Sequence, residues 1–185
     1  MNSTIYIIGV ILLLAIIGGI VGLIFAVRNR SKKYNDKYGA EYQNTIKTLG
    51  NEKKAQNEMD EREKHVGGLE IRPLTEEEHT LYLANWAAIQ AKFVDNPSQA
   101  TVEADHLIME VMQTRNYPIS SFEQRAADIS INYPKLVTNY RAAREIAKKN
   151  DRREASTEDL RKALVYYRSL FDELLEPEYA MVDKQ

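Results

Sequence analysis

Cysteine is absent from the 185 residues of the chain, so disulfides and thiolate metal sites are both excluded. An excess of one charge is also lacking. The net charge is −2 at pH 7, which gives no general reason to expect nucleic acid as a partner. The sequence contains no glycine-rich phosphate loop, no G-x-S-x-G motif and no H-E-x-x-H motif. We therefore predict no catalytic residue and no cofactor, and we expect a protein that is not an enzyme.

One long apolar stretch contrasts with the polar remainder of the chain. Residues 5–27 (IYIIGVILLLAIIGGIVGLIFAV) carry no charged side chain. A helix of this length, at about 1.5 Å per residue, spans the roughly 30 Å hydrocarbon core of a bilayer. Residues 1–4 are uncharged and basic residues follow the stretch, which is the reverse of the order in a cleaved signal peptide. We therefore predict an uncleaved, single-pass transmembrane anchor in the lipid bilayer.

Four basic residues crowd the C-terminal flank of this stretch: Arg28, Arg30, Lys32 and Lys33. The positive-inside rule places such a flank in the cytoplasm, so we expect the C-terminal domain there. A domain outside the cytoplasm, behind a signal anchor, is the competing interpretation. The same charges could also attract anionic lipid headgroups.

Small residues form a stripe on the predicted anchor: Ala15, Gly18, Gly19, Gly22 and Ala26. Such a stripe lets two helices approach closely and favours a homodimer in the membrane. The alternative is that glycine is simply frequent in membrane helices.

Residues 28–72 form a basic juxtamembrane segment followed by a charged stalk. Gly50 is typical of a helix end, and Asn51 of the cap of a second helix that stops at Gly67 and Gly68. That second helix is charged nearly all round, with Glu58 and Arg62 as an i,i+4 pair. We expect it to bury little of itself and to be a spacer or one strand of a poor coiled coil, because heptads are not sustained.

Residues 73–176 predict a bundle of about five helices, and residues 177–185 a C-terminal tail, so the whole chain is expected to be all-α. Thr75 and Glu78 form a capping box, Asn96 and Pro97 begin the next helix, and Ser156 caps the last one. The apolar face of the first bundle helix is predicted from its spacing to be Leu83, Trp86, Ala87, Gln90, Phe93 and Val94.

Two Tyr-Pro pairs, Tyr117-Pro118 and Tyr133-Pro134, mark helix boundaries, because the residue before proline avoids the helical region. The segment between them favours a groove where a partner could dock. Its candidate residues are Arg115, Tyr117, Phe122, Arg125, Asp128, Tyr140 and Arg141. If the charged residues here meet Asp105, we expect a salt-bridge network rather than a catalytic site.

A metal site is the alternative hypothesis. Two Glu-x-x-His pairs, Glu76 with His79 and Glu103 with His106, resemble the ligand spacing of carboxylate bundles, and Glu110 lies one turn beyond His106. Glu76 and His79 occupy an exposed first turn, however, and the bridging glutamates on other helices are missing. We therefore predict no metal and keep Glu103, His106 and Glu110 as the alternative set.

The run W..IQAKFVDNPSQATVEADHLIMEVMQTRNYP..SFEQRAADISINYPKLVTNYRAA, with LEIRPL before it and STEDLRKALVYYRSLFDELL after it, resembles an uncharacterised family of bacterial membrane-anchored helical proteins. That family's pattern reads Arg-Gly-Tyr-Pro where this chain has Arg115-Asn116-Tyr117-Pro118. Asparagine also tolerates the left-handed conformation that the glycine suggests. The pattern has arginine in place of His106, which weakens the metal hypothesis. The resemblance implies a bacterial origin and brings no established activity.

These features together predict a non-enzymatic interaction module tethered to the bacterial inner membrane, with its helical domain in the cytoplasm. Its partner is expected to be another membrane-associated protein. The alternatives are a metal-binding or enzymatic bundle and a structural, oligomeric envelope protein.

Overall fold

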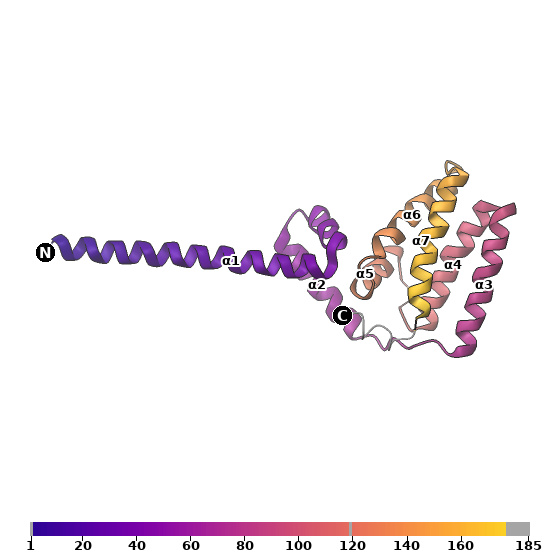
Figure 1. Ribbon diagram of the computed structural model, residues 1–185, viewed down its shortest axis with the longest axis horizontal. Helices are drawn as coiled ribbons and strands as arrows, with labels where there is room; N and C mark the ends of the chain where they lie inside the picture. The colour runs from indigo at the N-terminus through magenta and orange to yellow at the C-terminus, as the bar shows by residue number, and fades with distance from the viewer. Residues whose placement is uncertain (1, 119, 177–185) are drawn as a thin grey trace.

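The computed structural model describes residues 2–118 and 120–176, without the side chains of residues 2–15, 20, 21, 23, 24, 26 and 27. Over the described residues the fold is all-helical and contains no strand, which confirms the predicted class. The helices are α1 (Asn2–Leu49), α2 (Glu52–Gly67), α3 (Glu76–Asp95), α4 (Pro97–Thr114), α5 (Phe122–Asn132), α6 (Val137–Asp151) and α7 (Thr157–Leu175) (Figure 1). The predicted tail, 177–185, lies outside the described residues.

Helix α1 is a long rod that projects from the rest of the molecule (Figure 1). It kinks at Gly39, where φ is 50°, and it ends before Gly50, where φ is 64°. Both values fall in the left-handed region, which glycine enters without steric cost. Asn51 then caps α2 by accepting a hydrogen bond from the Lys54 amide at 3.0 Å, as predicted. The chain turns back at this point, so the end of α1 and α2 form a hairpin.

The predicted anchor, residues 5–27, lies within α1, but most of its side chains fall outside the described set. Among the residues that are described, no helix is long and apolar enough to qualify as a membrane span. In the predicted dimer stripe, the side chains of Ala15 and Ala26 lie outside the description. Gly18, Gly19 and Gly22 are exposed, and no atom from elsewhere in the chain lies within 4 Å of where a Cβ would stand.

The second half of the chain forms the predicted five-helix bundle, α3 to α7. Helix α3 packs on α4, α4 packs on α7, and α7 packs on α6, while α5 lies toward the hairpin (Figure 1). Trp86 of α3 stacks on Phe171 of α7 with ring centroids 4.8 Å apart in the centre of this core. The capping boxes at Thr75 with Glu78 and at Ser156 with Asp159 fix where α3 and α7 begin.

The face of α3 that packs inward differs from the prediction. Tyr82, Trp86 and Ile89 are buried, whereas Leu83 is 39% exposed and Val94 is 82% exposed. The reason is that α3 carries no charged residue from position 80 to position 91, so its apolar pattern does not single out one face. In the structure Trp86 faces α7 and Tyr82 faces α4, where its hydroxyl bonds to Thr114.

The charged stalk also differs from the prediction of a spacer or a coiled-coil strand. Its two helices share a small core of their own, in which Tyr38, Tyr42, Ala55 and Met59 are all at most 1% exposed. Ile131 of α5 packs against this core. The tyrosines lie on either side of the Gly39 kink, and Ala55 and Met59 of α2 pack against both in one cluster. The stalk is therefore a folded hairpin that docks on the bundle.

Candidate functional site

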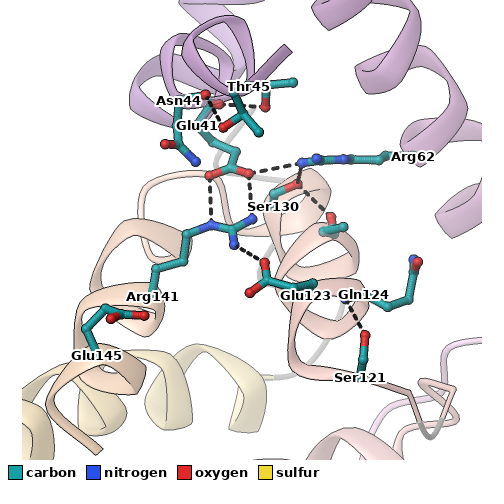
Figure 2. Close-up of polar contacts among 12 residues, drawn as sticks. Glu41, Asn44, Thr45, Arg62, Ser121, Glu123, Gln124, Ser130, Arg141 and Glu145 are labelled. Carbon is teal, nitrogen blue, oxygen red and sulfur yellow. Dashed lines mark hydrogen bonds and ion pairs between the residues drawn. The ribbon is translucent and has the colours of Figure 1, made fainter. Parts of the chain in front are cut away.

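The hairpin meets the bundle at a buried carboxylate, Glu41 of α1, which is 1% exposed. Its Oε1 accepts hydrogen bonds from Nη1 of Arg62 on α2 and from Nη2 of Arg141 on α6, each at 3.0 Å. Its Oε2 accepts a third from Nε of Arg141 at 3.3 Å. Figure 2 shows both guanidinium groups turned toward this one carboxylate, so Glu41 joins three helices.

Each of the two arginines also holds a second carboxylate nearer to solvent. Arg62 donates from Nε to Glu58 at 2.8 Å, and Arg141 donates from Nη1 to Glu123 at 2.9 Å (Figure 2 draws the Glu123 pair). The side chains of Glu58 and Glu123 are 42% and 73% exposed. Burial acts to lower the pKa of Arg141, but Glu41 and then Glu123 outweigh it and hold that pKa above its usual value. Arg141 therefore stays a cation in this position.

A cleft of about 200 Å³ opens above these ion pairs, between the hairpin and helices α5 and α6. Its floor is made by Glu41, Arg62 and Arg141. Its remaining lining residues are Asn44, Thr45, Thr48, Leu49, Glu58 and Glu123. The arrangement suits carboxylate groups, because both guanidinium groups are already oriented and each holds an exposed glutamate at the rim of the cleft.

A second polar contact joins the hairpin to α5. Asp128 is 1% exposed and accepts a hydrogen bond from Nε2 of Gln124 at 2.8 Å, while Nε2 of His65 on α2 lies 3.5 Å from the same carboxylate oxygen. The other oxygen, Oδ2, finds no hydrogen-bond partner among the described residues. Burial raises the pKa of Asp128, although Gln124, His65 and Arg62 act in the opposite direction.

The Asp128→Asn variant should test the cost of this buried charge. The folded protein binds a proton at Asp128 more tightly than the unfolded chain does. The contribution of Asp128 to stability therefore falls as the pH rises from about 3.9, the ordinary aspartate pKa, through the raised value. The variant should lack this decline and gain up to about 1 kcal/mol of unfolding free energy at pH 7. Urea unfolding from pH 4 to 8 measures this, with the exposed Asp151→Asn as the control. A wild-type pH profile in Asp128→Asn would contradict it.

Four of the seven residues predicted to form a docking surface lie in the interior. Arg115, Tyr117, Asp128 and Tyr140 are at most 3% exposed, so they are not available to a partner in this structure. The remaining three, Phe122, Arg125 and Arg141, are partly exposed. Sequence patterns place polar and aromatic residues at a helix corner, but they do not reveal that the corner is covered by other helices.

Arg115 illustrates how such a residue becomes structural. Its Nε donates to the carbonyl of Arg72 at 3.1 Å, and its Nη1 donates to the Tyr133 hydroxyl at 3.1 Å and the Leu174 carbonyl at 3.0 Å. The amide of Arg72 in turn donates to the Arg115 carbonyl at 3.1 Å. A buried guanidinium therefore fastens the linker before α3 and the end of α7 to the helix corner.

The predicted salt-bridge network does not form as one cluster. Asp105 lies 3.6 Å from Arg144, and Arg125 donates to the Ser120 carbonyl at 2.6 Å, while Arg141 belongs to the Glu41 site. The charged residues instead make separate contacts at different helix junctions.

The residues of the alternative metal set, Glu103, His106 and Glu110, do not form a common site. Glu103 is paired with Lys92 at 2.6 Å, which lowers the pKa of its carboxyl, with Gln99 as a second donor. His106 and Glu110 are exposed. Throughout the part of the chain that the structure describes, no group of three or more histidine, aspartate or glutamate side chains is placed to hold a metal ion.

The basic flank of the predicted anchor is partly engaged by the hairpin. Nη2 of Arg30 lies 3.2 Å from Asp60 of α2, and the Tyr34 hydroxyl also donates to Asp60. Arg28, Lys32 and Lys33 are exposed. The hairpin thus begins about one turn beyond the apolar stretch.

Glu41 was not singled out by the sequence, although one signal was present. It lies beside the buried Tyr42 and Thr45 in the part of α1 beyond the Gly39 kink, so it is a charge within an otherwise covered stripe. Burial of such a residue requires a cation from elsewhere in the fold. The Glu58–Arg62 pair was predicted and is confirmed at 2.8 Å.

Comparisons with protein-family models, curated proteins and solved structures find no match to this chain. The family resemblance therefore stays a prediction, as does the bacterial origin that it implies.

Proposed function

We propose that the chain is a non-enzymatic interaction module that a transmembrane helix holds at the inner face of a bacterial membrane. The uncharged stretch at residues 5–27 supports the anchor, and the basic residues that follow it support a cytoplasmic bundle. The partner we propose is another membrane-associated protein. Attachment to one surface raises the effective concentration of the bundle for such a partner without any new contact.

The observation that carries this proposal is that a helix, with one kink at Gly39, connects the predicted anchor to the hairpin. The part of α1 before the kink already pairs with α2 at Arg30, and the part beyond it carries Glu41, which is paired with the bundle. A flexible linker would let the bundle move freely relative to its anchor. Here folded structure connects the two, so the anchor would also set the height and orientation of the bundle above the bilayer.

A homodimer through the anchor belongs to the same proposal. Gly18, Gly19 and Gly22 face no other part of the chain, which leaves their surface free for a second copy. Two anchors that pack through this stripe would bring two bundles together on one membrane.

The anchor and its orientation predict the behaviour of the full chain in membranes. The protein should stay in the pellet after alkaline carbonate extraction, and a variant without residues 5–27 should move to the supernatant, because the apolar stretch is the feature that holds it in lipid. A C-terminal epitope should resist protease added to intact spheroplasts and be digested after lysis. Extraction of the full chain would refute the anchor, whereas digestion before lysis would refute only the orientation.

A further inference from the structure

We propose that the cleft above Glu41 binds a carboxylate group from outside the chain, through Arg141 and Arg62. This goes beyond membrane tethering and does not depend on it, because every residue involved lies in the hairpin or the bundle. The ligand class follows from the donors and from the groups that already occupy them.

The two guanidinium groups are held in place from below. Glu41 is 1% exposed and bonds to both arginines, so it fixes their orientation while staying out of contact with solvent. Together with Glu58 and Glu123 at the rim, three carboxylates face the two guanidinium groups, so a carboxylate from outside binds in place of a rim glutamate. The direction of the guanidinium groups is already set, which lowers the entropic cost of this exchange.

The rim shows which chemical group fits on this floor. Glu123 occupies Nη1 of Arg141, and Glu58 occupies Nε of Arg62, so both positions already accept a carboxylate. Both rim residues are substantially exposed, and Glu123 reaches its arginine from α5 with 73% of its side chain in solvent. Exposed ion pairs of this kind are weak, so an external carboxylate can replace them.

The cleft is large enough for a small acid or one acidic side chain, at about 200 Å³. Its wall on α1 is formed by Asn44, Thr45, Thr48 and Leu49, none of which is charged. Such a wall does not repel an anion. The ligand could be a free dicarboxylate or an acidic side chain of a protein partner, and the shared chemistry is the carboxylate.

Two probes distinguish these sources with the full-length protein in detergent micelles. Radiolabelled succinate in equilibrium dialysis represents the free acid, and a fluorescein-labelled hexaglutamate peptide in an anisotropy titration represents the acidic side chain. Binding of succinate assigns the site to a small molecule. Binding of the peptide alone assigns it to an acidic segment of a partner. The proposal is wrong if neither probe binds to the wild type or to Glu123→Gln at about 10 mM, which is ten times the Kd of a weak ligand of about 1 mM.

The decisive variant is Glu123→Gln. It removes the carboxylate that competes with an outside ligand for Arg141, and it should not disturb the fold because the side chain is exposed. It should tighten binding about two- to five-fold, the value of an exposed ion pair. Glu145→Gln is the matched control, because Glu145 lies one turn from Arg141 on α6 (Figure 2). Glu145 is exposed and pairs with Lys148. It makes the same change in charge and should leave affinity unchanged. Equal tightening in both variants would show a general electrostatic effect and overturn the site. Arg141→Gln should abolish binding, with circular dichroism as the check on folding.

Discussion

Glu41→Ala is expected to lower the free energy of unfolding by about 3 kcal/mol, which is the lower end of the range for removing one partner of a buried ion pair. The variant leaves Arg62 and Arg141 without the carboxylate that both share. Their side chains are 16% and 25% exposed, so each can still reach some water, and each keeps its partner at the rim. These two facts place the expected loss at the lower end.

The loss should be concentrated in the hairpin. Glu41 joins α1 and α2 to α6, whereas the contacts among α3, α4 and α7 do not involve it. Hydrogen exchange of the full chain should therefore show faster exchange in α2 and in residues 40–49 of α1, with protection retained in α3, α4 and α7. Uniform loss of protection across all helices would contradict a local role of Glu41.

Glu58→Ala is the control for this experiment. It removes a carboxylate from the same arginine, Arg62, but at the solvent-exposed rim. An exposed pair contributes at most about 1 kcal/mol, so this variant should remain close to the wild type. A comparable loss in both variants would mean that burial of Glu41 is not what matters.

Most of the contacts described between the hairpin and the bundle involve charged side chains. Of the apolar residues, Ile131 of α5 packs against the hairpin core, while the remaining contacts described above are ionic or polar. Buried ion pairs are screened little by salt. The ion pairs that hold the hairpin on the bundle should therefore be little affected by salt.

Local features of the fold were predictable from the sequence because they depend on neighbouring residues. The capping box at Thr75 places the start of α3, and Pro97 sits in the first turn of α4, as predicted. Asn116 adopts a φ of 67°, the left-handed conformation suggested by the glycine at this place in the pattern that the chain resembles. Each of these outcomes is set within a few positions of the residue concerned.

Contacts between distant segments were not predictable in the same way. Glu41 and Arg141 are 100 positions apart, and no local pattern links them. The hairpin was expected to be exposed because its helices are rich in charge, yet a buried charge is acceptable once two arginines meet it. The burial of Arg115 likewise depends on carbonyl groups from two other segments.

Trp86→Ala is expected to destabilise the bundle by about 3–5 kcal/mol, the range for removing a large aromatic side chain from a packed core. Trp86 is 1% exposed and stacks on Phe171, and the guanidinium of Arg168 lies 5.4 Å from its ring. Its removal leaves a cavity between α3 and α7 that the surrounding helices can fill only in part. Denaturant unfolding of the full chain, followed by far-ultraviolet circular dichroism, measures the change.

Leu83→Ala tests the orientation of the same helix. The apolar spacing of α3 placed Leu83 and Trp86 together on the inner face, but in the structure Leu83 is 39% exposed. A substitution on such a surface changes stability by no more than about 0.5 kcal/mol, unless another buried feature is lost. A loss of several kcal/mol in Leu83→Ala would mean that α3 is rotated toward the face predicted from its sequence. The two variants lie three residues apart, so their difference isolates the rotation of α3 from any general effect of shortening an apolar side chain in this helix.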